Sequence, residues 1–171
     1  MSKGYVHIYT GNGKGKTTAA FGVALRTLMI GKKVYVGQFI KGMKYSETKL
    51  EKVLDGILVE QYGVDCFIDK EPVEDDYKRA LEGYDKALKI VGEGLYDLVI
   101  LDEIFIAHYY KMITSEQIIN LIKNKNEKIE LILTGRYCIP ELYRYADLVT
   151  EMKEIKHYYE QGVLSREGID R

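Results

Sequence analysis

The stretch GYVHIYTGNGKGKTTAAFG, residues 4–22, decides the fold. A short run of β-forming residues leads into a cluster of glycines and lysines, and a helical spacing of apolar residues follows directly. The triplet Gly15-Lys16-Thr17 matches the end of the phosphate-binding pattern G-x-x-x-x-G-K-[ST]. The first glycine of that pattern would fall on Thr10, and the glycines are instead crowded at alternate positions, in G-N-G-K-G. The stretch predicts a strand, a phosphate-binding loop with an altered entry, and a helix.

The glycine loop is interpreted as an anion-binding site. Glycines allow a tight turn whose backbone amides point inward, and the positive end of the following helix adds to the attraction. A dinucleotide site of the G-x-G-x-x-G type is disfavoured, because Lys16 stands where close helix packing requires a small residue. The residues expected to bind the nucleotide in this loop are Thr10, Gly11, Asn12, Gly13, Lys14, Gly15, Lys16, Thr17 and Thr18.

Apolar strand-like runs alternate with helical patterns along the rest of the chain. Such alternation predicts a single α/β domain over residues 1–171, with three layers: a mainly parallel six-stranded sheet covered by helices on both faces. The tail at 154–171 fits no element and is either a lid over the ligand or a frayed end. Strands are expected at 5–10, 33–42, 56–63, 96–103, 128–135 and 146–153, and helices at 16–31, 46–54, 71–94, after Thr114 and from Pro140.

Composition excludes several classes of protein. The formal net charge of -1 lacks the basic excess of a general nucleic-acid binder. Cys66 and Cys138 have no C-x-x-C spacing, so neither a disulfide framework nor a zinc site is expected, and a reducing cytoplasm fits. No apolar run reaches the length of a membrane span, and the first strand begins too early for a signal peptide.

A second anchor for a phosphate-bound metal ion is found in YDLVILDE, residues 96–103. Its apolar run predicts a buried strand, and ligands bind where the strands of parallel sheets end. We expect Asp102 and Glu103, together with Thr17, to bind Mg²⁺ or Mn²⁺. Helix capping is the alternative role for this acidic pair. Glu103 could also orient a water molecule, so ATP hydrolysis stays open at this point.

The whole pattern resembles the P-loop type of ATP:corrinoid adenosyltransferase family. The resemblance covers nearly the full chain, and its strength lies in six motifs that follow one another at sensible spacing. These are TGNGKGKTTAAFG at 10–22, VGQFIKG at 36–42, DLVILDE at 97–103, LTGR at 133–136, ADLVTEM at 146–152 and IKHYYEQGVLSREGID at 155–170. In this family threonine precedes the first glycine, so Thr10 is a family feature.

The resemblance implies a RecA-like P-loop fold and transfer of the 5′-deoxyadenosyl group of ATP to the Co(I) of a reduced corrinoid, with triphosphate as the leaving group. It implies catalytic roles for Lys16, Thr17 and Glu103, and an approach of Arg136 to polar groups of the nucleotide or corrinoid. It further implies a nucleotide that lies the opposite way round from that of ordinary P-loop enzymes. An electron-donating flavoprotein such as flavodoxin and a homodimer are the partners it implies; neither nucleic acid nor a membrane is expected.

Some residues leave alternatives open. His7 is expected to be structural, whereas His108 and His157 are candidates for the site. Many family members carry an aromatic-rich stretch after the third strand, where this chain offers only Tyr62 and Phe67 as aromatic wedges.

A RecA-like ATPase or small-molecule kinase is the alternative enzyme, and a non-catalytic nucleotide-binding regulatory module is the alternative outside enzymes.

Overall fold

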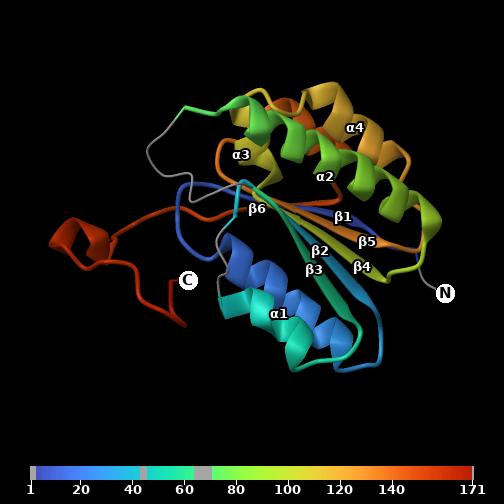
Figure 1. The fold of residues 1–171 in the computed structure, drawn as a ribbon, viewed down its shortest axis with the longest axis horizontal. Coiled ribbons are helices and arrows are strands. Elements are labelled where there is room, and N and C mark those ends of the chain that lie inside the picture. Colours follow the sequence, from blue (N-terminus) through green and yellow to red (C-terminus); the bar gives the residue numbers. More distant parts are fainter. Residues whose placement is uncertain (1–2, 43–45, 64–70, 171) are drawn as a thin grey trace.

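The computed structural model of the chain describes residues 3–42, 46–63 and 71–170. Six strands form one sheet, in which all neighbouring strands are parallel. The order across the sheet is β3-β2-β4-β5-β1-β6 (Figure 1). The strands are β1 (Val6–Thr10), β2 (Val34–Phe39), β3 (Ile57–Tyr62), β4 (Leu98–Asp102), β5 (Glu130–Thr134) and β6 (Leu148–Glu151).

Helices cover both faces of the sheet (Figure 1). On one face lie α1 (Lys16–Leu28) and the 3₁₀ helix η1 (Ser46–Lys52). On the other face lie α2 (Glu74–Glu93), α3 (Ile104–Tyr109) and α4 (Ser115–Lys123). Two further 3₁₀ helices are η2 (Pro140–Tyr145) and η3 (Tyr158–Gln161). The predicted three-layer α/β architecture with a parallel six-stranded sheet is confirmed.

The sheet is held by two cores, one on each face. Leu101 and Phe105 belong to the core beneath α2, α3 and α4, whereas Ile100 and Phe21 belong to the core beneath α1. Every residue of β4 is buried, as its uniformly apolar run predicts. Full burial of a Leu, Ile or Phe side chain contributes roughly 1.5–3 kcal/mol to the free energy of unfolding. The buried core therefore fixes the central strands and, with them, the residues that follow their ends.

Two local features differ from the sequence-based expectation. The segment Ser46–Lys52 is a 3₁₀ helix with no buried residue, because its many charges leave little apolar surface to stabilise an α-helix. The helix Ile104–Tyr109 was not expected, since six residues are too few to show a helical period. The last predicted strand is present as β6, which lies at the edge of the sheet, pairs with β1 alone, and is exposed at all four residues.

Four strands end in the same way, at the same edge of the sheet. The residue after each has a positive φ: 97° at Gly11, 65° at Ile40, 59° at Glu103 and 142° at Gly135. The chain therefore turns sharply as it leaves β1, β2, β4 and β5. In residues with a side chain this conformation costs about 1–3 kcal/mol, and such strain clusters at functional sites. This edge is where the candidate site lies.

Candidate functional site

The glycines of the loop that follows β1 satisfy two different constraints. A Cβ atom on Gly11 or Gly13 would lie 2.4 or 2.6 Å from the carbonyl oxygen of Met152, so only glycine permits this close approach to the end of β6. The amide of Gly13 donates to the same carbonyl at 2.7 Å. Gly15 has a φ of 115°, which favours glycine. Thr10 is still the last residue of β1, and the sharp turn begins after it, so position 10 requires no glycine.

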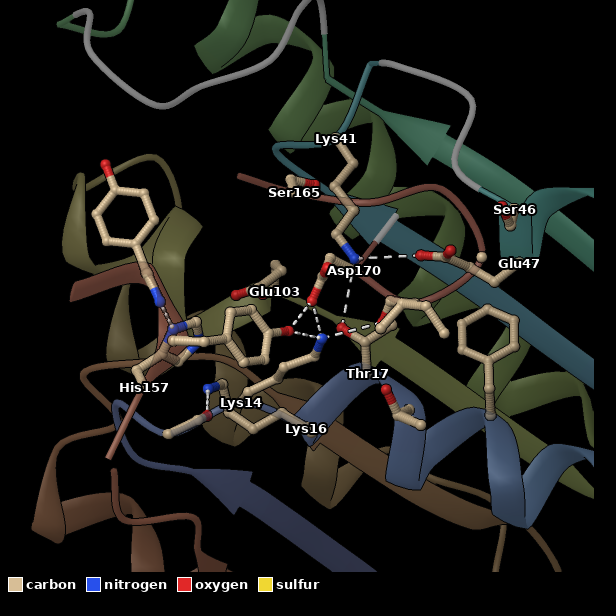
Figure 2. Close-up of a pocket in the computed structure, with 18 of the residues that line it drawn as sticks. Lys14, Lys16, Thr17, Lys41, Ser46, Glu47, Glu103, His157, Ser165 and Asp170 are labelled. Atoms are coloured by element: carbon tan, nitrogen blue, oxygen red, sulfur yellow. Dashed lines mark hydrogen bonds and ion pairs between the residues drawn. The ribbon is translucent and has the colours of Figure 1, made fainter. Parts of the chain in front are cut away.

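Lys16 is the first residue of α1 and is almost fully buried beneath the loop (Figure 2). Its Nζ atom donates to the carbonyl oxygens of Gly11 at 2.8 Å and Gly13 at 2.7 Å. Burial lowers the pKa of this lysine, with a smaller contribution in the same direction from Arg136. An ammonium group held at the positive end of a helix is suited to bind an anion with several charges.

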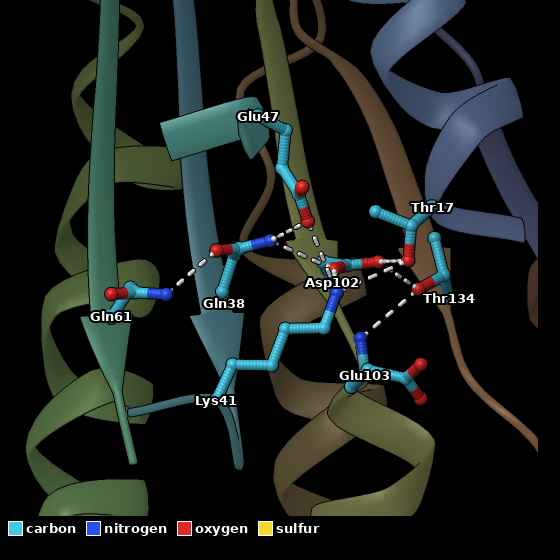
Figure 3. Close-up of polar contacts among 8 residues, drawn as sticks. All are labelled: Thr17, Gln38, Lys41, Glu47, Gln61, Asp102, Glu103 and Thr134. Carbon is cyan, nitrogen blue, oxygen red and sulfur yellow. Dashed lines mark hydrogen bonds and ion pairs between the residues drawn. The ribbon is translucent and has the colours of Figure 1, made fainter. Parts of the chain in front are cut away.

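Asp102, at the end of β4, is the centre of a buried hydrogen-bond network (Figure 3). Its carboxylate accepts from Thr134 at 2.7 Å and from Thr17 at 2.9 Å. It also accepts from Lys41 at 2.7 Å and from Gln38 at 3.2 Å. Burial alone would raise the pKa of Asp102, but the Lys41 ammonium and the hydrogen bonds outweigh it and lower this pKa. Asp102 is thus an anion that fixes the hydroxyl group of Thr17.

Glu103 follows Asp102 in a left-handed backbone conformation and faces the pocket (Figure 2). Its backbone amide donates to the hydroxyl oxygen of Thr134 at 3.0 Å, which ties its position to the Asp102 network. Its Oε2 atom is buried and has no hydrogen-bond partner among the described residues. Burial, and then the neighbouring Asp102 charge, raise the pKa of Glu103. A buried oxygen held without a partner is a feature that a bound ligand would explain.

Thr134→Val is expected to lower the free energy of unfolding by about 1–3 kcal/mol, since it leaves the Glu103 amide without its acceptor and removes a donor from Asp102. Urea unfolding measures this change. Thr27→Val is the matched control, because the Thr27 hydroxyl donates to the Val23 carbonyl within α1 and has no other hydrogen-bond partner in the described part of the chain. An equal, small effect of the two substitutions would contradict the structural role assigned to Thr134.

A pocket of about 580 Å³ opens above the glycine loop (Figure 2). Its wall is formed by the loop and the start of α1, by the residues that follow β2, β4 and β5, and by the tail after residue 156. Positive and negative side chains meet there, and the positive ones come from three separate segments. The charged residues that line it are Lys14, Lys16, Lys41, Arg136, Glu47, Glu103 and Asp170.

The tail lies against the glycine loop through Lys14. The Lys14 ammonium donates to the Tyr158 hydroxyl at 2.7 Å and to the Ile169 carbonyl at 3.0 Å, and it forms an ion pair with Asp170. Asp170 also pairs with Arg166 at 3.1 Å. The hydrogen bonds from Lys14 and Tyr158 lower the pKa of Asp170. The tail therefore brings a carboxylate to the mouth of the pocket, within reach of a loop lysine.

The residues predicted from the sequence fall into three places. Thr10, Gly11 and Asn12 line a neighbouring pocket of about 390 Å³, which shares Arg136 with the larger one. Asp102 lies behind the larger pocket, fully buried. The predicted residues that line the larger pocket are Gly13, Lys14, Gly15, Lys16, Thr17, Thr18, Glu103 and Arg136.

The three histidines are separated. His157 lines the larger pocket. His108 does not line it, and its Nε2 atom is 2.9 Å from the hydroxyl of Ser115. His7 lies 2.6 Å from Glu130 on the neighbouring strand, which agrees with a structural role. Phe67, one of the two possible aromatic wedges, lies outside the described residues.

Sequence reasoning missed several side chains that complete the site. Lys41 and Gln38 belong to the motif VGQFIKG, but their role depends on β2 lying beside β4, which the sequence alone did not show. Thr134 is the residue before the LTGR glycine, and β5 brings it beside Asp102. The polar residues at the ends of two apolar strands were a signal that could have been used.

The side chains of the pocket supply some, but not all, of the oxygen ligands that a hard divalent cation requires. Among the described residues no cluster of three His, Cys, Asp or Glu side chains could hold a metal ion by itself. Thr17 supplies a hydroxyl oxygen, and Glu103 supplies the unpartnered carboxylate oxygen. Mg²⁺ is typically held by one or two protein oxygens together with substrate phosphates. The site is therefore suited to a cation that arrives with a phosphate ligand.

In the part of the chain that the structure describes, no helix is long and apolar enough to cross a membrane.

Residues 2–170 match the model of a protein family described as ATP:corrinoid adenosyltransferase BtuR/CobO/CobP. The chain is 33% identical to the corrinoid adenosyltransferase of Escherichia coli (strain K12), and the match covers 98% of this chain and 86% of that protein. It is 32% identical to corrinoid adenosyltransferase CobA of Salmonella typhimurium (strain LT2), with the same coverage. A Sinorhizobium corrinoid adenosyltransferase is 34% identical, over 98% of this chain and 80% of that protein.

Proposed function

The chain belongs to the ATP:corrinoid adenosyltransferase family, an enzyme family whose substrates are ATP and a corrinoid, and from this premise we propose a role for each group in the pocket. The reaction joins cobalt to the 5′ carbon of the ribose. The Co(I) centre supplies the electron pair for the new Co–C bond and is formally oxidised to Co(III). The C5′–O5′ bond breaks, and its electron pair leaves on triphosphate. No proton is transferred in this step, so no general base is required.

Lys16 and the amides at the start of α1 hold the triphosphate in this proposal. The observation that carries it is the buried Lys16 ammonium, whose acceptors among the described residues are loop carbonyls, at the base of a pocket lined with further cations. Charge develops on the leaving oxygen as the C5′–O5′ bond breaks. Fixed positive groups that face the developing charge lower the barrier, because they need no reorganisation during the reaction. Arg136 binds a further polar group of the nucleotide or corrinoid.

Thr17 and Glu103 hold Mg²⁺ or Mn²⁺ in this proposal, together with phosphate oxygens. Such an ion supplies neutralisation of charge on the phosphates. Asp102, predicted as a third metal ligand, already accepts four hydrogen bonds or ion pairs from neighbouring side chains. We assign it the role of orienting the Thr17 hydroxyl, so that an oxygen lone pair of Thr17 stays directed at the pocket.

The products of one incubation test this function against the alternatives. The protein is mixed with Mg-ATP and chemically reduced cobinamide or cobalamin, and the phosphate product is identified. Triphosphate, formed together with a light-sensitive Co–C bond, is the expected result. ADP or free phosphate formed without any dependence on corrinoid would indicate an ATPase or kinase, and unchanged ATP would indicate a regulatory module.

The reductant and the assembly are proposals from the family resemblance. Co(I) must be generated by an electron donor, and we propose a flavoprotein such as flavodoxin. A homodimer and a cytoplasmic location complete the proposal. The chain as a whole acts as one adenosyltransferase domain, with the tail at 154–171 as its lid.

Removal of residues 154–171 is expected to raise the KM for corrinoid about tenfold while ATP binding changes less, because the tail touches the loop at Asn12 and Lys14 but lines much of the pocket mouth. Steady-state kinetics and equilibrium ATP binding measure the two effects. Far-ultraviolet circular dichroism checks that the shortened protein is folded. Equal losses in both measurements from a folded protein would argue against a lid.

A further inference from the structure

Lys41 lines the pocket and places its ammonium beside Asp102 and the Thr17 hydroxyl, one of the two groups assigned to the metal ion (Figure 3). It follows β2, and its Nζ atom lies 2.7 Å from a carboxylate oxygen of Asp102 and 3.3 Å from the hydroxyl oxygen of Thr17. A third oxygen, from Glu47, is 3.5 Å away. The side chain is only 18% exposed. A positive charge is thus surrounded by two carboxylates and a hydroxyl in a largely buried corner.

These oxygen atoms are also the kind that a hard divalent cation binds. The unpartnered Oε2 atom of Glu103 belongs to the residue that follows Asp102. A divalent ion at Thr17 and Glu103 would lie close to the Lys41 ammonium, and two like charges a few ångströms apart repel strongly when little water separates them. Lys41 and a metal ion therefore compete for this corner unless additional negative charge is present.

We propose that Lys41 takes the place of the metal ion in the nucleotide-free protein, so that the metal enters only together with the triphosphate. The inference rests on the proposed metal site at Thr17 and Glu103. Phosphate oxygens bring the negative charge that allows both cations to remain, and they offer the ammonium new acceptors once it turns from Thr17. Lys41 is in this sense a positioning residue, which keeps the Thr17 hydroxyl ordered before the substrate binds.

The test measures binding of Mn²⁺ to the nucleotide-free protein, by the loss of the free-ion signal in electron paramagnetic resonance. Wild-type protein is expected to bind Mn²⁺ weakly, and Lys41→Met about tenfold or more tightly, because the repelling charge is removed while the oxygens remain. Lys41→Arg keeps the charge and is expected to bind as weakly as the wild type. Lys49→Met is the matched control, since Lys49 is exposed and pairs only with Glu167 among the described residues.

A second pair of variants locates the ion. Lys41→Met combined with Glu103→Gln is expected to lose the gain in Mn²⁺ affinity, because the unpartnered carboxylate is then absent. A gain that persists in this double variant would place the ion elsewhere and overturn the inference. An unchanged Mn²⁺ affinity in folded Lys41→Met would overturn it as well.

Asp102 loses its ion pair in Lys41→Met, so stability is followed in parallel. Mn²⁺ is expected to raise the Tm of Lys41→Met by more than that of the wild type, since a ligand stabilises the state to which it binds. Lys41→Gln provides a second neutral variant if the methionine variant does not fold. An equal shift in Tm for neutral variant and wild type would contradict the inference.

The proposed metal site is tested independently by comparing the binding of ATP in Mg²⁺ with that in EDTA. Mg²⁺ is expected to tighten ATP binding in the wild type but not in Glu103→Gln. If Glu103→Gln retained the tightening, the metal site itself would be wrong. If only the Lys41 variants failed to gain Mn²⁺ affinity, the metal site would stand and the role of Lys41 would fall.

Discussion

Lys16→Ala is expected to lower kcat/KM for ATP by about 10³-fold or more, with a loss in kcat as well as in binding. The ammonium of Lys16 is buried at the base of the pocket and is held in place by two loop carbonyls. In the proposed binding mode, its charge faces the triphosphate both in the bound substrate and while the C5′–O5′ bond breaks. The interaction strengthens as charge accumulates on the leaving oxygen, so its removal raises the barrier.

The rate of Co–C bond formation with reduced cobalamin measures this effect, and triphosphate release provides the second signal. Lys49→Ala is the control for loss of a lysine, since Lys49 lies at the surface in a weak ion pair with Glu167. Thermal unfolding separates a loss of chemistry from a loss of fold. Near-normal turnover of Lys16→Ala would show that the phosphates bind elsewhere.

Glu103→Gln is expected to lower kcat by about 10²-fold or more while it raises the free energy of unfolding by ~1 kcal/mol at neutral pH. The activity is expected to fall because the proposed metal ion would lose a charged ligand. The stability rises because the Glu103 carboxylate is buried, lies beside Asp102, and has an oxygen without a partner. A neutral amide of the same shape removes the cost of holding a charge there.

The gain in stability expected for Glu103→Gln depends on pH. The pKa of Glu103 in the folded protein is raised above its ordinary value of 4.5, so the ionised side chain destabilises the fold at neutral pH. The wild type recovers this stability as the pH falls through the raised pKa. The advantage of Glu103→Gln is therefore expected to shrink on acidification from pH 7 towards the ordinary range of glutamate. Glu82→Gln, on the exposed side of α2, should show no such gain.

The fold and the phosphate loop could be predicted because their signals are local. Strand, glycine loop and helix follow one another within residues 4–22, and the buried β4 is one continuous apolar run. The sharp turns at the strand ends could be predicted from the sequence only in part. Glycine marks the turn at Gly11, but Glu103 adopts the same conformation with a side chain, and nothing local distinguishes it from an acid that caps a helix.

The division of labour between Asp102 and Glu103 could not be predicted, because it depends on which strands are neighbours. Asp102 is occupied by side chains from β2, β5 and α1, whereas Glu103 keeps an oxygen without a partner. The role of Lys41 could not be predicted for the same reason, because Lys41 follows β2 and contacts Asp102 on the neighbouring strand β4. The placement of the tail beside Lys14 required the three-dimensional fold, since more than 140 residues separate the contacting groups.

The contact between the glycine loop and Met152 has an evolutionary consequence. Gly11 and Gly13 meet the main chain at residue 152, and no substitution there can move the carbonyl oxygen that a new Cβ would strike. Positions 11 and 13 are therefore constrained by the main chain at residue 152, and the side chain at position 152 is constrained separately, since the Met152 sulfur atom would lie 3.5 Å from a Cβ atom on Gly15. Related sequences should therefore keep glycine at positions 11 and 13, whichever side chain stands at position 152.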